Sequence, residues 1–297
     1  MRSFFLSAVP TFFAHALRSA RHLTHRFGLL WALCVAVSPH IAMAQNLELG
    51  VLPNVSARLL LTQYQPMQTF LSQRLGRPVV VSTAPSWREF YQRTKAGQYD
   101  IVVAAGNVAR LAETDLKYRP LLSYEPLVPG LFVTRKGESA APAVLLKNQS
   151  LALANPASLV AFEGMRWLSQ QGLEAGTQFN TVQVKGDDSV GSAIVRGMAV
   201  AGVMSMGEFR AHPPEIRDQL NIHTRFADVA SFLVSVNPKV DATLAEQIKV
   251  ALLEFGRDGT EGRAFFERTG FTGIVPLQAS TLQKLDVHVD NTRKLLD

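Results

Sequence analysis

Residues 50–113 read GVLPNVSARLLLTQYQPMQTFLSQRLGRPVVVSTAPSWREFYQRTKAGQYDIVVAAGNVARLAE and alternate between strand and helix patterns. Apolar residues recur at helical spacing over 57–75, where Pro66 predicts a kink or a break, and again over 86–97, where Ser86 is the expected N-cap. Strands are expected at 47–52, 78–83 and 99–106, and the last of these is nearly all apolar, as in a strand buried on both faces. Strand, helix, strand, helix, strand predicts an α/β unit with a parallel sheet.

The second half of the chain repeats this order. Strands are expected at 150–156, 180–186 and 200–206, with helices at 158–171 and 188–197. Segments 120–137 and 222–238 have strand patterns and would connect the two units, and helical patterns follow over 241–256, 260–269 and 279–296. Two α/β units with two crossings predict a two-lobed binding architecture, in which a ligand lies in the cleft beyond the carboxyl ends of the strands. Such a cleft closes about a hinge.

The N-terminus has the features of a secretion signal. Four arginines and no acidic residue precede the apolar run at 27–37, and Ala42-Met43-Ala44 supplies a small-x-small cleavage site. A membrane anchor is the alternative, but the run is far shorter than the roughly 20 residues that span a bilayer. We expect cleavage after Ala44 and a soluble periplasmic protein. The long charged region leaves open a start codon downstream of Met1.

Composition excludes several classes of function for the mature chain. Cys34 is the only cysteine and lies in the signal, so neither a disulfide nor a cysteine nucleophile is expected. The net charge falls from +6 to +2 when the four signal arginines leave, and no basic cluster predicts a nucleic-acid partner. His212, His223 and His288 lack metal-ligand spacing. Without a nucleophile motif either, we expect no enzyme, no catalytic residue, no metal and no cofactor.

Four motifs carry a family resemblance. They are Gly-x-x-Pro at 50–53, Tyr-x-Pro-Met at 64–67, Trp87 at a helix start and Lys-Ala-Gly-Gln-x-Asp at 95–100. With this order, nearly the whole mature chain resembles the phosphonate/phosphate-type periplasmic solute-binding proteins, the type II receptors of ABC importers. The resemblance implies two Rossmann-like lobes with mixed, mainly parallel sheets and a hinge. Lobe 1 would comprise 45–135 and 236–297 with the C-terminal helices, and lobe 2 would comprise 136–235. The resemblance also implies a monomer that delivers a small molecule to a membrane permease.

The stretch LALANPASLVAFEG, residues 151–164, departs from this family at its binding corner. There the family usually has a run of Ser and Thr that ends in Gly, and the hydroxyls and helix N-terminus hold an oxyanion. Here only Ser158 matches, and Leu159, Val160 and Ala161 follow it. We therefore expect a reduced anion site and a small ligand that is an oxyanion, a carboxylate or a more apolar compound.

Further positions at the predicted cleft differ from the family. Asn54 replaces a frequent aromatic residue, Asn107 a proline, and Ser205-Met206 an acidic residue, while Asp187-Asp188 stand where a His often precedes an acid. Each side chain also has a structural interpretation as a turn, a helix cap or a core residue. The candidate ligand-binding residues are Asn54, Trp87, Gly106, Asn107, Ser158, Leu159, Asp187, Asp188, Ser205 and Met206.

Two functions remain open at this point. The first is an importer receptor. The second is a periplasmic sensor, or an accessory subunit of an envelope signalling or redox system, which binds a ligand without transport. Both share the predicted fold, so the sequence does not separate them, and it does not identify the ligand.

Overall fold

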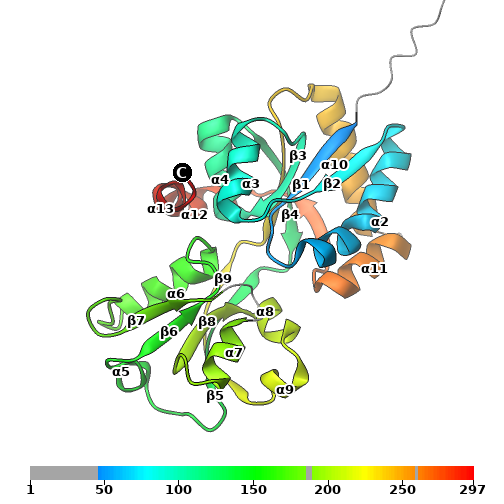
Figure 1. Cartoon of the computed structure of the whole chain (residues 1–297). Coiled ribbons are helices and arrows are strands. Elements are labelled where there is room, and N and C mark those ends of the chain that lie inside the picture. The colour runs from blue at the N-terminus through cyan, green and yellow to red at the C-terminus, as the bar shows by residue number, and fades with distance from the viewer. Residues whose placement is uncertain (1–45, 185–188, 258–259) are drawn as a thin grey trace, which may run out of the picture. The chain divides into compact units, whose positions relative to one another are not determined.

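The computed structural model describes residues 46–184, 189–257 and 260–297 (Figure 1). Its strands form two sheets. The first sheet has the order β11 (Gly273–Pro276), β4 (Arg119–Glu125), β10 (Phe232–Val236), β3 (Ile101–Ala105), β1 (Leu47–Val51) and β2 (Val79–Ser82). The second has the order β7 (Asn180–Gln183), β6 (Ser150–Leu153), β8 (Ala201–Ser205), β5 (Val128–Arg135) and β9 (Leu220–Val229).

Each sheet has parallel pairs on one side and antiparallel pairs on the other. β1 runs parallel to β2 and β3, and β6 runs parallel to β7 and β8. β4, β10 and β11 add antiparallel pairs to the first sheet, and β5 and β9 add them to the second. The predicted α/β fold with two mixed sheets is confirmed.

Helices connect the strands of each sheet. We call the first sheet and its helices the first lobe: α2 (Ala57–Leu75), α3 (Trp87–Lys95), α4 (Gly106–Leu116), α10 (Ala242–Arg257), α11 (Thr260–Thr269), α12 (Ala279–Leu285), the 3-10 turn η1 (Asp286–His288) and α13 (Val289–Leu296). The second sheet and its helices form the second lobe: α5 (Pro142–Leu145), α6 (Leu159–Ser169), α7 (Ser189–Val195), α8 (Met206–Ala211) and α9 (Pro214–Arg217).

The strand pairing places the two crossings away from residues 135 and 235, where the sequence suggested them. β5 pairs with β8 and β9 and so belongs to the second sheet, while β10 pairs with β3 and β4 in the first. The chain passes between the sheets at 126–127 and at 230–231. Pro126 has no N–H to donate to a strand ladder, which accounts for the end of β4 at Glu125.

Apolar packing explains why α2 runs through Pro66. The helix is continuous from Ala57 to Leu75, so the expected break is absent, and it buries Leu60, Tyr64, Met67 and Leu71 against the first sheet. A proline inside a helix costs about 3 kcal/mol. The burial of four large side chains, at about 1.5–3 kcal/mol each, offsets that cost.

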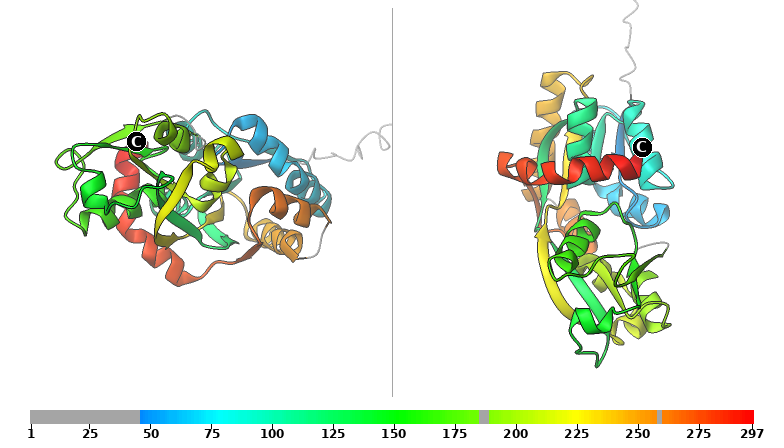
Figure 2. Two further views of the ribbon diagram at one scale, coloured as in Figure 1. Left: turned by 90° about the horizontal axis from the view of Figure 1, so that it is seen from below. Right: turned by 90° about the vertical axis from the view of Figure 1, so that its left-hand side faces the viewer.

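The C-terminal helices α12 and α13 pack on α3 and α4 of the first lobe (Figure 2). Their residues Leu285, Val289 and Leu296 are buried in a core cluster that also includes residues of the second lobe, among them Leu153 and Leu159. Within the part of the chain that the structure describes, no helix has both the length and the apolarity needed to cross a membrane.

Candidate functional site

The starts of α4 and α6 lie directly against each other. Both helices follow the carboxyl end of a parallel strand: α4 begins directly after β3, and residues 154–158 connect β6 to α6. Asn107 in the first turn of α4 donates from Nδ2 to the carbonyl oxygen of Ala157, 2.9 Å away, next to the N-cap of α6. The structure therefore brings Gly106, Asn107, Ser158 and Leu159 of the predicted site together.

Asn107 is fully buried and connects three elements. Besides Ala157, its Nδ2 donates to Oγ1 of Thr292 on α13 at 2.9 Å, and that hydroxyl donates to the carbonyl oxygen of His288 at 2.7 Å. Oδ1 of Asn107 has no hydrogen-bond partner among the described residues. A buried acceptor without a partner is costly, so this oxygen is suited to a donor that arrives from outside.

Ser158 caps α6, as its sequence position predicted. Its Oγ accepts a hydrogen bond from the N–H of Ala161 at 3.1 Å, while Oδ1 of Asn155 accepts from the N–H of Ala157 at 2.9 Å. The N–H groups of Leu159 and Val160 have no acceptor within residues 46–184, 189–257 and 260–297. The helix start thus keeps the free amides and the positive dipole end that favour an anion.

The side chains at this helix start are apolar and buried. Leu159, Val160 and Ala161 are 4%, 8% and 4% exposed and belong to the cluster shared with α4 and the C-terminal helices. Hydroxyl groups at these positions would add donors to the corner, whereas the methyl groups present add none.

Gly106 has a packing reason for its lack of a side chain. A Cβ there would lie 3.1 Å from Cδ1 of Leu285 and 3.2 Å from Cβ of Ala230. Trp87 is partly buried and donates from Nε1 to the carbonyl oxygen of Pro53 at 3.1 Å, which ties α3 to the loop after β1. In that loop the N–H of Asn54 donates to the carbonyl oxygen of Leu52 at 2.9 Å.

Ser205 and Met206 also have structural contacts. Oγ of Ser205 accepts from the N–H of Glu208 at 3.0 Å, and the Glu208 carboxylate accepts from the N–H of Ser205, which forms a capping box at the start of α8. Burial raises the pKa of the Glu208 carboxyl. Met206 packs against the core of the second lobe. Asp187 and Asp188 lie outside the described residues. A ligand contact stays a prediction for all ten candidates.

Sequence reasoning missed a polar contact between α6 and the C-terminal helices. Nε2 of His288 lies 3.0 Å from Oε1 of Glu163, and the His288 ring stacks on Phe162 with 5.6 Å between centroids and 8° between planes. Burial lowers the pKa of His288, and the Glu163 carboxylate acts in the opposite direction. No motif marks these residues, because the contact joins segments more than 120 positions apart.

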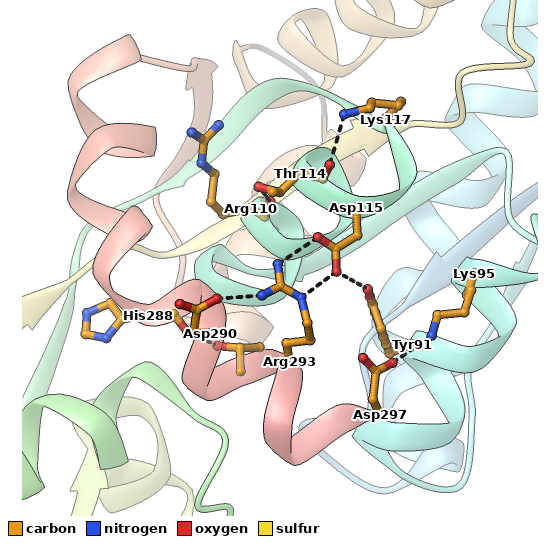
Figure 3. Close-up of polar contacts among 11 residues, drawn as sticks. Tyr91, Lys95, Arg110, Thr114, Asp115, Lys117, His288, Asp290, Arg293 and Asp297 are labelled. Carbon is orange, nitrogen blue, oxygen red and sulfur yellow. Dashed lines mark hydrogen bonds and ion pairs between the residues drawn. The ribbon is translucent and has the colours of Figure 1, made fainter.

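Arg293 on α13 holds the C-terminal helix to α4 (Figure 3). Its guanidinium donates two hydrogen bonds of 2.8 Å to the two carboxylate oxygens of Asp115 and one of 2.5 Å to Asp290. The hydrogen bond from Arg293 is the main reason why the pKa of Asp115 lies below its usual value, and Tyr91 Oη adds a weaker contact at 3.4 Å. Paired, planar hydrogen bonds of this kind fix orientation as well as adding energy.

The Asp115→Asn variant should unfold about 1–3 °C below the wild type at pH 7. Because the pKa of Asp115 is depressed in the folded protein, the contact stabilises fully above the unfolded pKa near 3.9 and is lost as pH falls through the folded pKa. The difference between the two midpoints should therefore shrink below about pH 4. Thermal unfolding from pH 7 to pH 3 measures it. Asp290→Asn is the control, since that side chain is 83% exposed and should matter less. A constant difference across this range would contradict the assignment.

Comparison with known proteins agrees with the fold. The family model described as "ABC transporter, phosphonate, periplasmic substrate-binding protein" matches residues 49–282. Curated proteins give no match in sequence. The chain also contains no group of three or more His, Cys, Asp or Glu side chains placed to hold a metal ion, as far as the structure describes it.

Solved structures share the fold at low sequence identity. A Xanthomonas citri protein bound to ATP is 22% identical with a TM-score of 0.71, over 86% of this chain and all of that one. PhnD1 from Prochlorococcus marinus in complex with methylphosphonate is 12% identical with a TM-score of 0.74, over 84% and 98%. A binding protein component of an ABC phosphonate transporter from Pseudomonas aeruginosa is 12% identical with a TM-score of 0.71, over 85% and 89%. The chain therefore belongs to the phosphonate family of periplasmic substrate-binding proteins of ABC transporters.

Proposed function

We propose that this periplasmic receptor captures a ligand less charged than a phosphonate dianion, at the facing starts of α4 and α6, for delivery to an ABC importer. One observation carries the proposal. The binding corner keeps its helix N-terminus and its Ser158 cap, but buried apolar side chains occupy the next three positions. The receptor role rests on the family membership of the chain. The proposed ligand class rests on the residues at the start of α6.

Charge around the predicted cleft supports a ligand of low charge. The described loops beyond the carboxyl ends of the strands contain neither Lys nor Arg: 52–56, 83–87, 105–107, 154–158 and 205–206. Within these described loops a dianion would meet only amide, hydroxyl and indole donors, while residues 185–188, which include Lys185, lie outside the described part of the chain. Each missing hydrogen bond to a charged group removes roughly 1.5–3 kcal/mol. The loss of two of them would abolish much of the roughly 8 kcal/mol behind a micromolar affinity.

The remaining groups suit a carboxylate or a zwitterion with an apolar body. The free N–H groups of Leu159 and Val160 can hold one anionic oxygen at the helix start. Oδ1 of Asn107 can accept from an ammonium, amide or hydroxyl group. The apolar side chains of Leu159 and Val160 and the partly buried ring of Trp87 would contact the body of the ligand.

A thermal-unfolding screen of residues 45–297 tests this proposal. Phosphate, phosphite, methylphosphonate, alkanesulfonates, carboxylates, amino acids and thiamine-like heterocycles are added one at a time. A ligand at 100 times its Kd stabilises the native state by about 2.7 kcal/mol, or roughly 5–10 °C for a chain of this length. We expect this shift with a monoanionic or zwitterionic compound and none with phosphate or methylphosphonate. Micromolar binding of methylphosphonate would overturn the proposal.

A receptor that reports ligand occupancy without transport is the second candidate, and the loss of the corner hydroxyls favours it. The gene neighbourhood separates the two candidates. Adjacent genes for a permease and an ATPase support the importer, whereas an adjacent sensor kinase or oxidoreductase supports the second candidate.

A further inference from the structure

The carboxyl group of Glu208 lies at the edge of the second sheet where α6 begins. β6 and β8 are parallel neighbours with Leu153 opposite Val203, so their carboxyl ends share this edge. β8 ends at Ser205, and the side chain of Glu208 folds back from the first turn of α8 to accept from the N–H of Ser205. Neighbouring strands are about 4.8 Å apart. The carboxylate therefore lies one strand away from the loop 154–158 that leads into α6.

The same edge is the end of the second sheet that is connected to the first lobe. Gly130 of β5 lies opposite Ser205, and β5 begins at Val128, directly after the crossing at 126–127. In open α/β sheets, ligands bind beyond the carboxyl ends of the parallel strands. Glu208 thus lies where the two-lobed fold is expected to hold its ligand, although no sequence motif marks it.

The carboxylate of Glu208 has no cationic partner in the part of the chain that the structure describes. Oε2 accepts from the N–H of Ser205, and Oε1 has no hydrogen-bond partner among the described residues. No Lys, Arg or His side chain among them forms an ion pair with it. Burial raises the pKa of this carboxyl more than the hydrogen bonds from Ser205 lower it. A cation that reaches Oε1 would therefore stabilise the charged form.

Two other partly buried acids show the usual arrangement. Oε1 of Glu163 lies 3.0 Å from Nε2 of His288, and Oε2 of Glu113 lies 2.6 Å from Nη1 of Arg110. The helix cap does not explain why Glu208 is charged, because glutamine serves at the third position of a capping box as well as glutamate does. A half-buried charge is costly unless it is paired. The negative charge of Glu208 thus points to a partner from outside the described residues.

We propose that Glu208 binds a cationic nitrogen of the ligand, while the free N–H groups at the start of α6 hold an anionic oxygen of the same molecule. The ligand is then a small zwitterion. Only a few bonds separate its two charges, because the two groups that bind them lie on neighbouring strands of one sheet edge. This inference rests on the proposed function for the place of the ligand, and it narrows the ligand class.

Matched pairs of compounds test whether the site recognises a positive charge. The two members of each pair differ only by an ammonium group in place of a hydroxyl group. The pairs are 4-aminobutyrate and 4-hydroxybutyrate, taurine and 2-hydroxyethanesulfonate, leucine and 2-hydroxy-4-methylpentanoate, and 2-aminoethylphosphonate and 2-hydroxyethylphosphonate. Isothermal titration calorimetry of the mature chain, residues 45–297, measures each compound up to millimolar concentration. In at least one carboxylate or sulfonate pair, we expect the ammonium member to bind about tenfold or more tightly than its hydroxyl partner.

The variant Glu208→Gln removes the charge and keeps an acceptor for the N–H of Ser205. It should weaken binding of the ammonium member about ten- to a hundredfold and leave the hydroxyl member nearly unchanged. Glu215→Gln on α9 is the matched control, because it removes an exposed carboxylate of the same lobe and should change neither affinity. Circular dichroism confirms that both variants are folded. If Glu208→Gln keeps the wild-type preference for the ammonium member, the inference is wrong.

The inference and the proposed function fail in different ways. If a carboxylate or sulfonate binds but its hydroxyl member binds as tightly as its ammonium member, the proposed function stands and the role of Glu208 is wrong. If only the phosphonate pair binds, with a preference for the ammonium member that Glu208→Gln abolishes, the role of Glu208 stands and the proposed ligand class is wrong. If no ammonium compound binds at millimolar concentration, the role of Glu208 is overturned, whatever else binds.

Discussion

Replacement of Phe265 by alanine should lower the free energy of unfolding by about 3–5 kcal/mol. Phe265 on α11 is fully buried and lies among four other rings. The centroid distances are 5.1 Å to Tyr64, 5.3 Å to Phe266, 5.5 Å to Phe255 and 6.2 Å to Tyr124, all with edge-on geometry. These rings come from α2, α10, α11 and β4. The alanine variant would therefore leave a cavity between four elements, which cannot all move inward to fill it.

Urea unfolding of residues 45–297, followed by circular dichroism, measures this loss as a fall in midpoint at constant slope. Phe209→Ala on α8 is the control, because Phe209 is only partly buried and lies outside the aromatic cluster. We expect that variant to lose less than half as much stability. An equal loss in the two variants would mean that α11 does not organise the core of the first lobe.

The central elements of each lobe could be predicted because their signals are local. The apolar run at 99–106 contains β3, and the pattern at 86–97 contains α3 with Ser86 as its N-cap, whose Oγ accepts from Glu89 N at 3.1 Å. β11 could not be predicted in the same way. It has four residues at the edge of its sheet, and only its antiparallel pairing with β4 defines it.

In the candidate site, too, local features could be predicted from the sequence and long-range contacts could not. A cap such as Ser158 is set by its own turn, so the sequence predicted it and the structure confirms it. The contact of Asn107 with Thr292 spans 185 residues and depends on how α13 returns across α4. Periodicity says that 279–296 is helical and has an apolar face, but it does not say which helix that face covers.

Replacement of Val160 by threonine should raise the affinity for methylphosphonate about tenfold or more. Threonine has nearly the shape of valine, so the backbone at the start of α6 can stay as it is. The new hydroxyl would stand beside the free N–H of Val160 and offer one more donor to an anionic oxygen. A hydrogen bond to a charged group contributes roughly 1.5–3 kcal/mol, and 1.4 kcal/mol corresponds to a factor of ten in Kd. Isothermal titration calorimetry of both proteins measures the gain.

Two control variants show whether an effect of Val160→Thr comes from the start of α6 as a ligand site. Val240→Thr places the same hydroxyl at a valine that is 7% exposed, close to the 8% of Val160, but before α10 and away from the corner. Val240→Thr should lower the free energy of unfolding about as much as Val160→Thr does, but it should leave the affinity for methylphosphonate unchanged. Ser158→Ala should lose about 1 kcal/mol as a cap and, if the corner holds the ligand, should also weaken whatever ligand the wild type binds. If Val160→Thr folds and gains nothing, while Ser158→Ala changes only the unfolding midpoint, then the start of α6 is a structural cap. The ligand contacts would then have to come from the other candidates, such as Asn107, Asn54 and Trp87.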